Sequence, residues 1–198
     1  MNADRLLASV CGASASVRKL AAGATLFSAD TPSAGVYTVV KGRVRLERIT
    51  ERGKEAVLFV AQPGAPFAEA SIFSDVYHCS AVAVTNVSVN FYPKQKLLAE
   101  FRDNPVFTLA YARMLGHQLM LARTRLERAN MNNAGERIRH FLMLETGPDG
   151  YSLERPGALK ELAAELSLTP EALYRTLTQM TKAGEIERTT SALHLIGR

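Results

Sequence analysis

The sequence predicts an α+β protein in which a β domain is followed by a long helix and a C-terminal helix-turn-helix with a wing. Three observations support this fold class. Short apolar runs punctuated by Gly and Pro fill residues 17–95, a helical period replaces them over residues 95–130, and two short helices joined by a tight turn lie near the C-terminus. We therefore expect three parts: residues 1–100, 101–131 and 132–198.

The composition is that of a globular protein. The chain has 198 residues, 47% of them hydrophobic and 22% charged, which suffices for one large or two small domains with a real core. It lacks the run of about 18 apolar residues that a membrane helix needs, and its N-terminus, with Asp4 and no apolar core, is a poor signal peptide. We expect a cytoplasmic protein with no membrane partner. Cys11 and Cys79 are too few for a disulfide framework or a metal site and are expected to be reduced thiols.

The net charge of +5 and a pI near 9.4 favour an anionic partner. The charge is unevenly distributed, because the segment from Ala134 to Arg198 holds 8 basic and 9 acidic residues. If this segment binds DNA, it does so through a few placed side chains and not through bulk positive charge.

The first part is predicted to be a short helix over Ala3–Val10 followed by strands. The runs "VYTVV" and "RVRLERI" flank Lys41-Gly42, where Gly supplies the positive φ of a β-hairpin turn. Thr50–Gly53 predicts the next turn, before the strand "KEAVLFVA". The loop "QPGAPF" and two strands in "AVAVTNVSVNFY", broken near Thr85-Asn86, complete the pattern of a barrel, roll or sandwich.

Residues 95–130 are predicted to form a helix of about eight turns, from their 3.5-residue apolar spacing. Such a narrow stripe on a long helix either packs on its own β domain or pairs with a second copy of the chain. We favour a dimer, because the preceding domain is too small to cover the whole length. The expected dimer seam, flanked by Arg123, Arg125 and Arg128, is Ala112, Leu115, Leu119, Ala122, Leu126 and Ala129.

A new helix is predicted to begin after Asn133. Asn followed three residues later by Glu136 is a capping-box pattern, which makes Asn130–Asn133 a candidate hinge. The helix is expected to end near "ETGPDG", where Gly and Pro prevent its continuation.

The C-terminal residues predict a helix-turn-helix. A first helix over Leu159–Leu166 leads to a turn at Ser167-Leu168, and Thr169 then caps a second helix that Gly184 ends. Pro170 suits the first helical position. Strands over Ile186–Arg188 and Leu193–Ile196 predict a wing.

The second helix is the candidate DNA-reading element. Arg can pair with guanine through two hydrogen bonds, and Glu can accept one from cytosine. The alternative is a generic helical hairpin with a solvated face, but a helix pair followed by a wing is more specific than either part alone. The residues expected to contact DNA are Thr169, Pro170, Glu171, Ala172, Arg175, Thr176 and Gln179.

From about residue 17 to its end, the chain resembles the Crp/Fnr superfamily of bacterial transcription regulators. The resemblance is carried by the segments "LAAGATLFSADTPSAGVYTVVKGRVRL", "AEASIF" and "LAAELSLTPEALYRTLTQM" and by the long helix at Leu109–Ala129. It implies a cyclic-nucleotide-binding-type β-roll, a homodimer bound to a pseudo-palindromic DNA site, and contact with RNA polymerase. It also implies that a sensory event in the roll or hinge resets the DNA-binding domains.

Within the recognition helix, Glu171 and Arg175 match base-reading residues of that family. Pro170 replaces an Arg that is often found there, so one base contact is lost and the operator should differ. Ser167 replaces the common turn Gly and should be mildly strained in a left-handed conformation.

The segment that resembles the family's phosphate cassette lacks its cationic centre. Glu69 and Ser80 match the family pattern, but Ala68 replaces its Gly and Cys79 its Arg. Because a desolvated phosphate without a charge partner is costly, the sequence argues against control by a cyclic nucleotide. Ala122 and Arg123 are also poor equivalents of the family's base-contacting helix residues. The candidate effector pocket comprises Glu69, Tyr77, His78, Cys79, Ser80 and Arg123.

Several signals remain open. An iron–sulfur cluster is argued against, because it needs several cysteines. Haem or metal binding through His78 and Cys79 is hindered because adjacent strand residues point to opposite faces. Cys79 is a packed core thiol, a redox switch activated by His78, or a residue that contacts a ligand. A further alternative is a constitutive regulator whose β-roll binds no ligand. The sequence has no phosphate loop, nucleophile elbow or metal pair, so we do not expect an enzyme.

Overall fold

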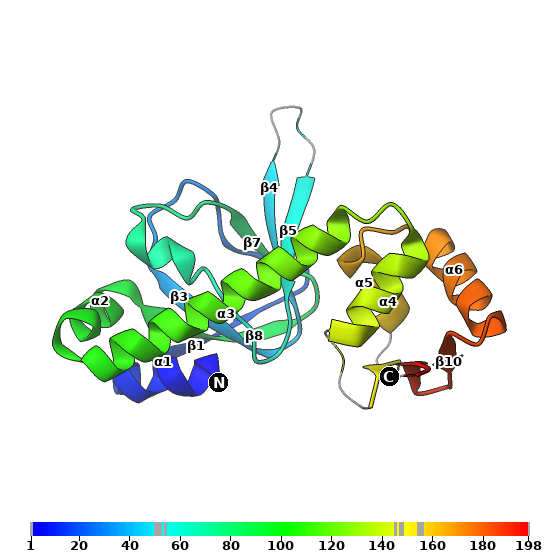
Figure 1. Cartoon of the computed structure of the whole chain (residues 1–198). Helices are drawn as coiled ribbons and strands as arrows, with labels where there is room; N and C mark the ends of the chain where they lie inside the picture. Colours follow the sequence, from blue (N-terminus) through cyan, green and yellow to red (C-terminus); the bar gives the residue numbers. More distant parts are fainter. Residues whose placement is uncertain are drawn as a thin grey trace. The chain divides into compact units, whose positions relative to one another are not determined.

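The computed structural model describes residues 2–49, 53, 55–144, 146, 149–153 and 157–197. It divides into two compact units, Met1–Gln118 and Leu119–Arg198, and α3 runs from the first into the second (Figure 1).

The first unit contains two four-stranded antiparallel sheets packed on one core. One sheet has the order β1-β8-β3-β6, with bounds Ser16–Leu20, Val87–Pro93, Gly35–Lys41 and Pro66–Phe67. The other has the order β2-β7-β4-β5, with bounds Thr25–Phe27, Ser80–Ala83, Val44–Ile49 and Glu55–Ala61. Side chains from both sheets meet in a single hydrophobic cluster, so the β domain is a roll.

The predicted hairpin at Lys41-Gly42 is wrong. β3 pairs with β8 and β6, whereas β4 pairs with β5 and β7, so the turn carries the chain from one sheet to the other. Gly42 has the expected positive φ of 82°, and a Cβ there would lie 2.4 Å from the carbonyl oxygen of Asn86. A glycine is therefore needed here because the chain changes sheets at this turn and packs closely against the turn at Asn86. Of the predicted turn Thr50–Gly53, residues 50–52 lie outside the described residues.

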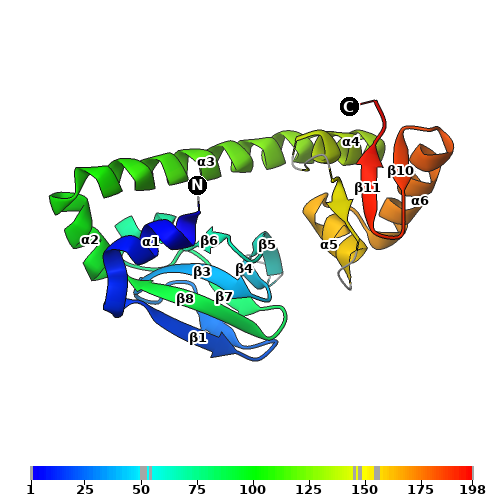
Figure 2. The same ribbon diagram turned by 90° about the horizontal axis from the view of Figure 1, so that it is seen from below.

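Strand β3 is buried from Gly35 to Val39, because both faces of its sheet are covered there. Tyr37 and Val39 point into the roll, while Val36 packs with α1 (Ala3–Cys11) and α2 (Lys94–Asp103). Figure 2 shows α1 and α2 beside this sheet. Two short 3₁₀ helices, η1 (Gly12–Ser14) and η2 (Ala70–Phe73), complete the unit.

The helix predicted over residues 95–130 is interrupted at Asn104. Asn104 has an extended φ of −129°, and its Oδ1 accepts a 3.0 Å hydrogen bond from the backbone N–H of Phe107. Pro105 then begins α3 (Pro105–Ala129). An Asn cap and a Pro at the first position are a helix start, which the apolar periodicity concealed.

The second unit contains the helix-turn-helix and a three-stranded wing. Its helices after α3 are α4 (Ala134–Leu144), α5 (Ala158–Glu165) and α6 (Pro170–Lys182). The wing has the order β10-β11-β9, with bounds Ile186–Arg188, Ala192–Leu195 and Tyr151–Ser152. Strand β9 was not predicted, because two residues are too short for a strand pattern. Asn133 Oδ1 accepts from the N–H groups of Gly135 (2.7 Å) and Glu136 (3.4 Å), which confirms the predicted cap.

Candidate DNA-reading surface and effector region

The turn between α5 and α6 has the geometry of a helix-turn-helix. Ser167 adopts the left-handed conformation predicted for it, with φ 53°. Thr169 then caps α6, because its side chain accepts a 3.1 Å hydrogen bond from the N–H of Ala172. Leu173, Leu177 and Met180 are buried and hold the inner side of α6 on the domain core.

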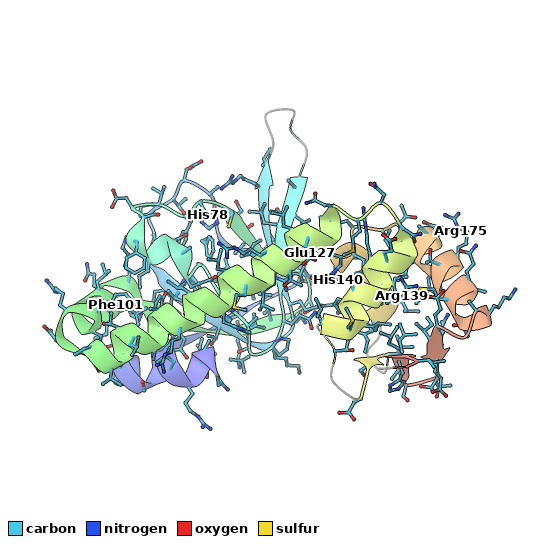
Figure 3. The ribbon with its side chains drawn as sticks, in the orientation of Figure 1. His78, Phe101, Glu127, Arg139, His140 and Arg175 are labelled. Carbon is cyan, nitrogen blue, oxygen red and sulfur yellow. The ribbon has the colours of Figure 1, made fainter. Side chains whose placement is uncertain are left out.

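The opposite side of α6 carries most of the predicted DNA-reading residues. Arg175 projects from this side of the helix (Figure 3), and Ala172 is half-buried. A hydrogen bond from the residue's own backbone N–H, and then one from the Thr169 side chain, hold the pKa of the Glu171 carboxyl below its usual value. The predicted residues that are exposed are Thr169, Pro170, Glu171, Arg175 and Gln179.

Two residues of α6 differ from the prediction. Thr176 was expected to point outward, but it is 9% exposed and its hydroxyl donates to the carbonyl of Ala172. Its methyl group lies near Gly135 at the start of α4, so it packs inward. Tyr174, which sequence reasoning missed, is 47% exposed, and the Arg188 guanidinium of the wing lies 5.9 Å from its ring centre.

Arg137 joins the hinge to the helix-turn-helix, a role that its position in α4 did not reveal. Its guanidinium donates to the carbonyl of Met131 (2.7 Å) in the hinge and to that of Ala129 (3.4 Å), the last residue of α3. It also donates to the carbonyls of Leu166 (3.1 Å) and Ser167 (3.2 Å) in the turn. One side chain thus ties four backbone groups from two segments together.

The predicted dimer seam is largely exposed on α3. Leu119 is 52% and Leu126 64% exposed, and Ala112, Ala122 and Ala129 are exposed as well. Leu115 is half-buried and packs partly against the cluster of α1 and α2. The seam is therefore an apolar stripe on the solvent side of the helix.

The cassette-like segment begins with a strained residue. Ala68 has φ 61°, a conformation that favours glycine, at the position where the resembled family has Gly. Burial raises the pKa of the neighbouring Glu69 carboxyl, and its own backbone N–H opposes this shift.

Two predicted pocket residues hold the roll together. The Tyr77 hydroxyl accepts 3.0 Å hydrogen bonds from the N–H groups of Ala34 and Gly35, and its ring stacks on Phe27 with centres 3.8 Å apart. Ser80 Oγ accepts a 2.9 Å bond from the N–H of Ala29. Tyr77 is 2% exposed and is a core residue.

His78 and Cys79 were expected on a strand but lie in a bend just before β7, where one is exposed and the other buried. His78 is exposed, and its Nδ1 lies 2.9 Å from Ser71 Oγ. Cys79 is 2% exposed; burial raises the pKa of its thiol, Arg48 acts in the opposite direction and Glu69 raises it further. A raised pKa keeps the thiol protonated and unreactive, which favours the core interpretation of Cys79 over the redox one.

The other predicted features are placed as follows. Arg123 is exposed on α3, in the second unit. Within the described ranges, no three His, Cys, Asp or Glu side chains gather in a way that would hold a metal ion. None of the helices that the structure describes combines the length and apolar character needed to cross a membrane.

Comparison with known proteins identifies the β domain. Residues 17–104 match the family model described as "Cyclic nucleotide-binding domain". The structure of FixK2 from Bradyrhizobium japonicum aligns with a TM-score of 0.71 at 20% identity, over 93% of each chain. This likeness extends to the fold of both units.

Curated relatives cover most of the chain. The "Global nitrogen regulator" of Synechocystis sp. is 23% identical over 176 residues, which is 83% of this chain and 77% of that protein. The protein of the same name from Nostoc sp. is 26% identical over 61% of this chain, a match that spans 55% of the relative. The "Nitrogen fixation regulation protein FixK" of Bradyrhizobium diazoefficiens is 25% identical over 83% of this chain and 71% of that protein. The cyclic-nucleotide-binding-type roll, the helix-turn-helix with a wing, and relatives named as transcription regulators together support a place for the chain in the Crp/Fnr superfamily.

Proposed function

We propose that the protein is a homodimeric, sequence-specific regulator whose helix α6 reads a pseudo-palindromic DNA operator. The observation that carries this proposal is the exposed row of Glu171, Arg175 and Gln179 on a capped helix whose other side is buried. Residues 132–198 would form the DNA-binding domain, residues 101–131 the dimerisation helix and hinge, and residues 1–100 the sensor.

The C-terminal segment has no excess of positive charge, which agrees with DNA reading by a few specific side chains of α6. Because the segment after residue 133 has slightly more acids than bases, specificity would come from base contacts by Glu171 and Arg175. The exposed Arg188 of the wing supports a backbone contact beside them. Pro170 contributes no side-chain hydrogen bond, so the operator would differ from one read by an Arg at that position.

The exposed seam of α3 supports dimerisation. Burying Leu119 and Leu126 against the same residues of a second copy would remove two large apolar side chains from water. In such a dimer, the two recognition helices enter successive major grooves about 34 Å apart.

The signal is proposed to be something other than a cyclic nucleotide. Cys79 supplies no charge for a phosphate, Ala68 has a Cβ where glycine allows close approach, and the rings of Phe27, Tyr37 and Tyr77 stack inside the roll. Calorimetric titration of cyclic AMP and cyclic GMP should show no heat of binding; micromolar affinity would contradict this part of the proposal.

A constitutive regulator with no ligand is the second candidate. It is favoured by the hydrogen bonds of Tyr77 and Ser80, since both side chains are used to hold the roll's own backbone. The operator-binding curve of the purified protein would then be unchanged by cell extract or by oxidant. A shift that a small-molecule fraction of the extract reproduces would favour a sensor instead.

The decisive experiment is selection of bound sequences from a random DNA library, followed by footprinting. A two-fold pattern of protection supports the proposal, and binding that selects no sequence contradicts it.

Leu119→Arg should dissociate the dimer in analytical ultracentrifugation and abolish the two-fold footprint. Val106→Arg is the matched control, because Val106 is 80% exposed on the same helix but lies off the seam. RNA polymerase contact is tested by transcription in vitro from a promoter that carries the selected operator.

A further inference from the structure

His140 on α4 is a buried ionisable side chain that the proposed function does not use. The residue is 8% exposed, and neither of its ring nitrogens has a hydrogen-bond partner among the described residues. Glu127, near the end of α3, places its Oε2 3.5 Å from His140 Nε2 (Figure 3). The two residues come from helices on either side of the hinge at residues 130–133.

A neutral imidazole is poorly satisfied in this position. It has one N–H donor and one acceptor nitrogen, and buried groups of this kind normally find partners. The separation of 3.5 Å is longer than the roughly 2.9 Å of a good N–H···O bond. A protonated imidazole adds a charge that attracts the carboxylate of Glu127, although water around the exposed Glu127 side chain weakens this attraction. Proton uptake therefore favours the arrangement in which His140 and Glu127 are adjacent.

The other charges around His140 act in both directions. Arg128 on α3 is 1% exposed, lies 5.1 Å from the ring centre of Phe141, and disfavours a second positive charge nearby. Burial lowers the pKa of Arg128, Glu165 raises it and Arg125 lowers it. Glu165 on α5 offsets this positive charge, since its Oε1 is 3.7 Å from Arg128 and 2.9 Å from Arg125.

Other ionisable side chains lie on α4 itself and on the elements packed against it. On α4, Glu136 lies one turn before His140, and Arg139 forms an ion pair with Glu185. Arg137 is bonded to backbone carbonyls. Strand β11, which packs on α4, carries His194, and α6 contributes uncharged side chains near Gly135. Glu127 is thus the acid with which the structure pairs His140.

We propose that His140 and Glu127 form a pH-sensitive latch across the hinge, which closes on protonation of His140. Histidine is the side chain whose charge ordinarily changes between about pH 5 and 8. The closed latch holds α4, and with it the helix-turn-helix, against the end of α3. Because proton binding and operator binding are then coupled, operator affinity rises as the pH falls. This inference rests on the proposed function, because it takes operator binding as its output.

The test measures operator affinity by fluorescence anisotropy at about pH 8 and about pH 6. The wild type should gain about threefold or more at the lower pH. Glu127→Gln keeps the size of a side chain that is 65% exposed, so it should fold normally. Its operator affinity should lie within about twofold of the wild-type value at the higher pH and should not rise at the lower pH. Two variants serve as controls. His194→Asn removes the histidine of the wing, and Asp103→Asn removes an exposed acid that is distant from His140 in the sequence. The operator affinity of both variants should still rise at the lower pH.

Three outcomes decide the proposal. If the operator affinity of Glu127→Gln depends on pH as much as that of the wild type, the proposal is overturned. It is also overturned if His194→Asn loses the rise in affinity at the lower pH while Glu127→Gln keeps it. His140→Gln is the second variant and should behave like Glu127→Gln.

If no operator is bound at either pH, the proposed function fails, and the latch is then tested without DNA. Amide hydrogen exchange over residues 130–144 should slow at the lower pH in the wild type relative to Glu127→Gln at the same pH; identical rates overturn the latch.

Discussion

The hydroxyl of Tyr111 on α3 donates a 2.9 Å hydrogen bond to the backbone carbonyl of Glu69, the first polar residue of the cassette-like segment. Tyr111 is 1% exposed, and the ring of Phe101 meets it edge-on at 4.9 Å. Burial, with a smaller contribution from Glu69, raises the pKa of Tyr111, so the phenol keeps its proton and remains a donor. This contact joins the cassette-like segment to α3 within the first unit.

Replacing Tyr111 with Phe should lower the free energy of unfolding by about 1–3 kcal/mol, because the Glu69 carbonyl loses its donor in a buried place. Urea unfolding followed by circular dichroism measures the change. Tyr174→Phe is the matched control, since Tyr174 is 47% exposed, and should alter stability by no more than about 0.5 kcal/mol. Equal effects of the two replacements would show that the buried hydrogen bond contributes nothing.

Asp4 should make the first unit sensitive to acid. Burial alone would raise the pKa of the Asp4 carboxyl, but hydrogen bonds from Thr38, Asn90 and Tyr92 outweigh it and hold that pKa below the ordinary value. The lower folded-state pKa stabilises the protein above the unfolded value of about 4, and this contribution is lost as the pH falls through the folded value. Asp4→Asn should therefore narrow the difference in unfolding free energy between about pH 6 and about pH 3.

The control for this measurement is Asp103→Asn, which removes an exposed acid from α2. The free energy of unfolding of this variant should depend on pH in the same way as that of the wild type. If Asp4→Asn shows the same acid sensitivity as the wild type, the three hydrogen bonds to Asp4 do not govern it.

Both thiols should be slow to react in the folded protein. Burial raises the pKa of Cys11 to about 11, with Lys96 opposing and Glu100 adding to the shift, and burial also raises the pKa of Cys79. Because the thiolate is the reactive form, iodoacetamide at neutral pH should modify neither residue until denaturant is added. Mass spectrometry of the time course measures this. Rapid modification of Cys79 in the folded state would restore the redox-switch hypothesis.

Replacements of two adjacent residues of α6 should differ in their effect on operator affinity. Arg175→Gln should cost about 1–3 kcal/mol of operator affinity and much less on random DNA, because it removes the base contact proposed for this side chain. Thr176→Val should change the affinity by less than about twofold, because Thr176 is buried and its hydroxyl bonds within the helix. Anisotropy titrations on the selected operator and on a scrambled duplex compare the two. A large specific loss in Thr176→Val would mean that this side chain reaches the bases.

Much of the secondary structure was predictable because its signals are local. Thr169, Pro170 and Gly184 mark the limits of the second helix of the helix-turn-helix in the sequence, and the structure begins this helix, α6, at Pro170 with Thr169 as its cap. Asn133 was likewise identified as a cap. The break at Asn104 was missed, although "DNP" carries the same signals, because the apolar period continues through it.

Strand partners and side-chain directions were less predictable because they depend on residues distant in the sequence. The turn at Gly42 looked like a hairpin, yet its strands joined different sheets and its glycine was needed for contact with Asn86. Thr176 looked like a surface residue until α4 packed against it. Strand β9 exists through pairing with β11, and two residues have no pattern of their own.

The sequence by itself determined the order of the elements, the limits of α6 and the missing charge at Cys79, since each depends on residue type at a known spacing. Only the tertiary structure decided how the cassette-like residues are used. It bonded Tyr77 and Ser80 to the roll's own backbone, buried Cys79, and brought Tyr111 to Glu69 and Glu127 to His140. The physical reason is that burial and pairing depend on which surfaces meet, and the spacing of residues along the chain does not specify that.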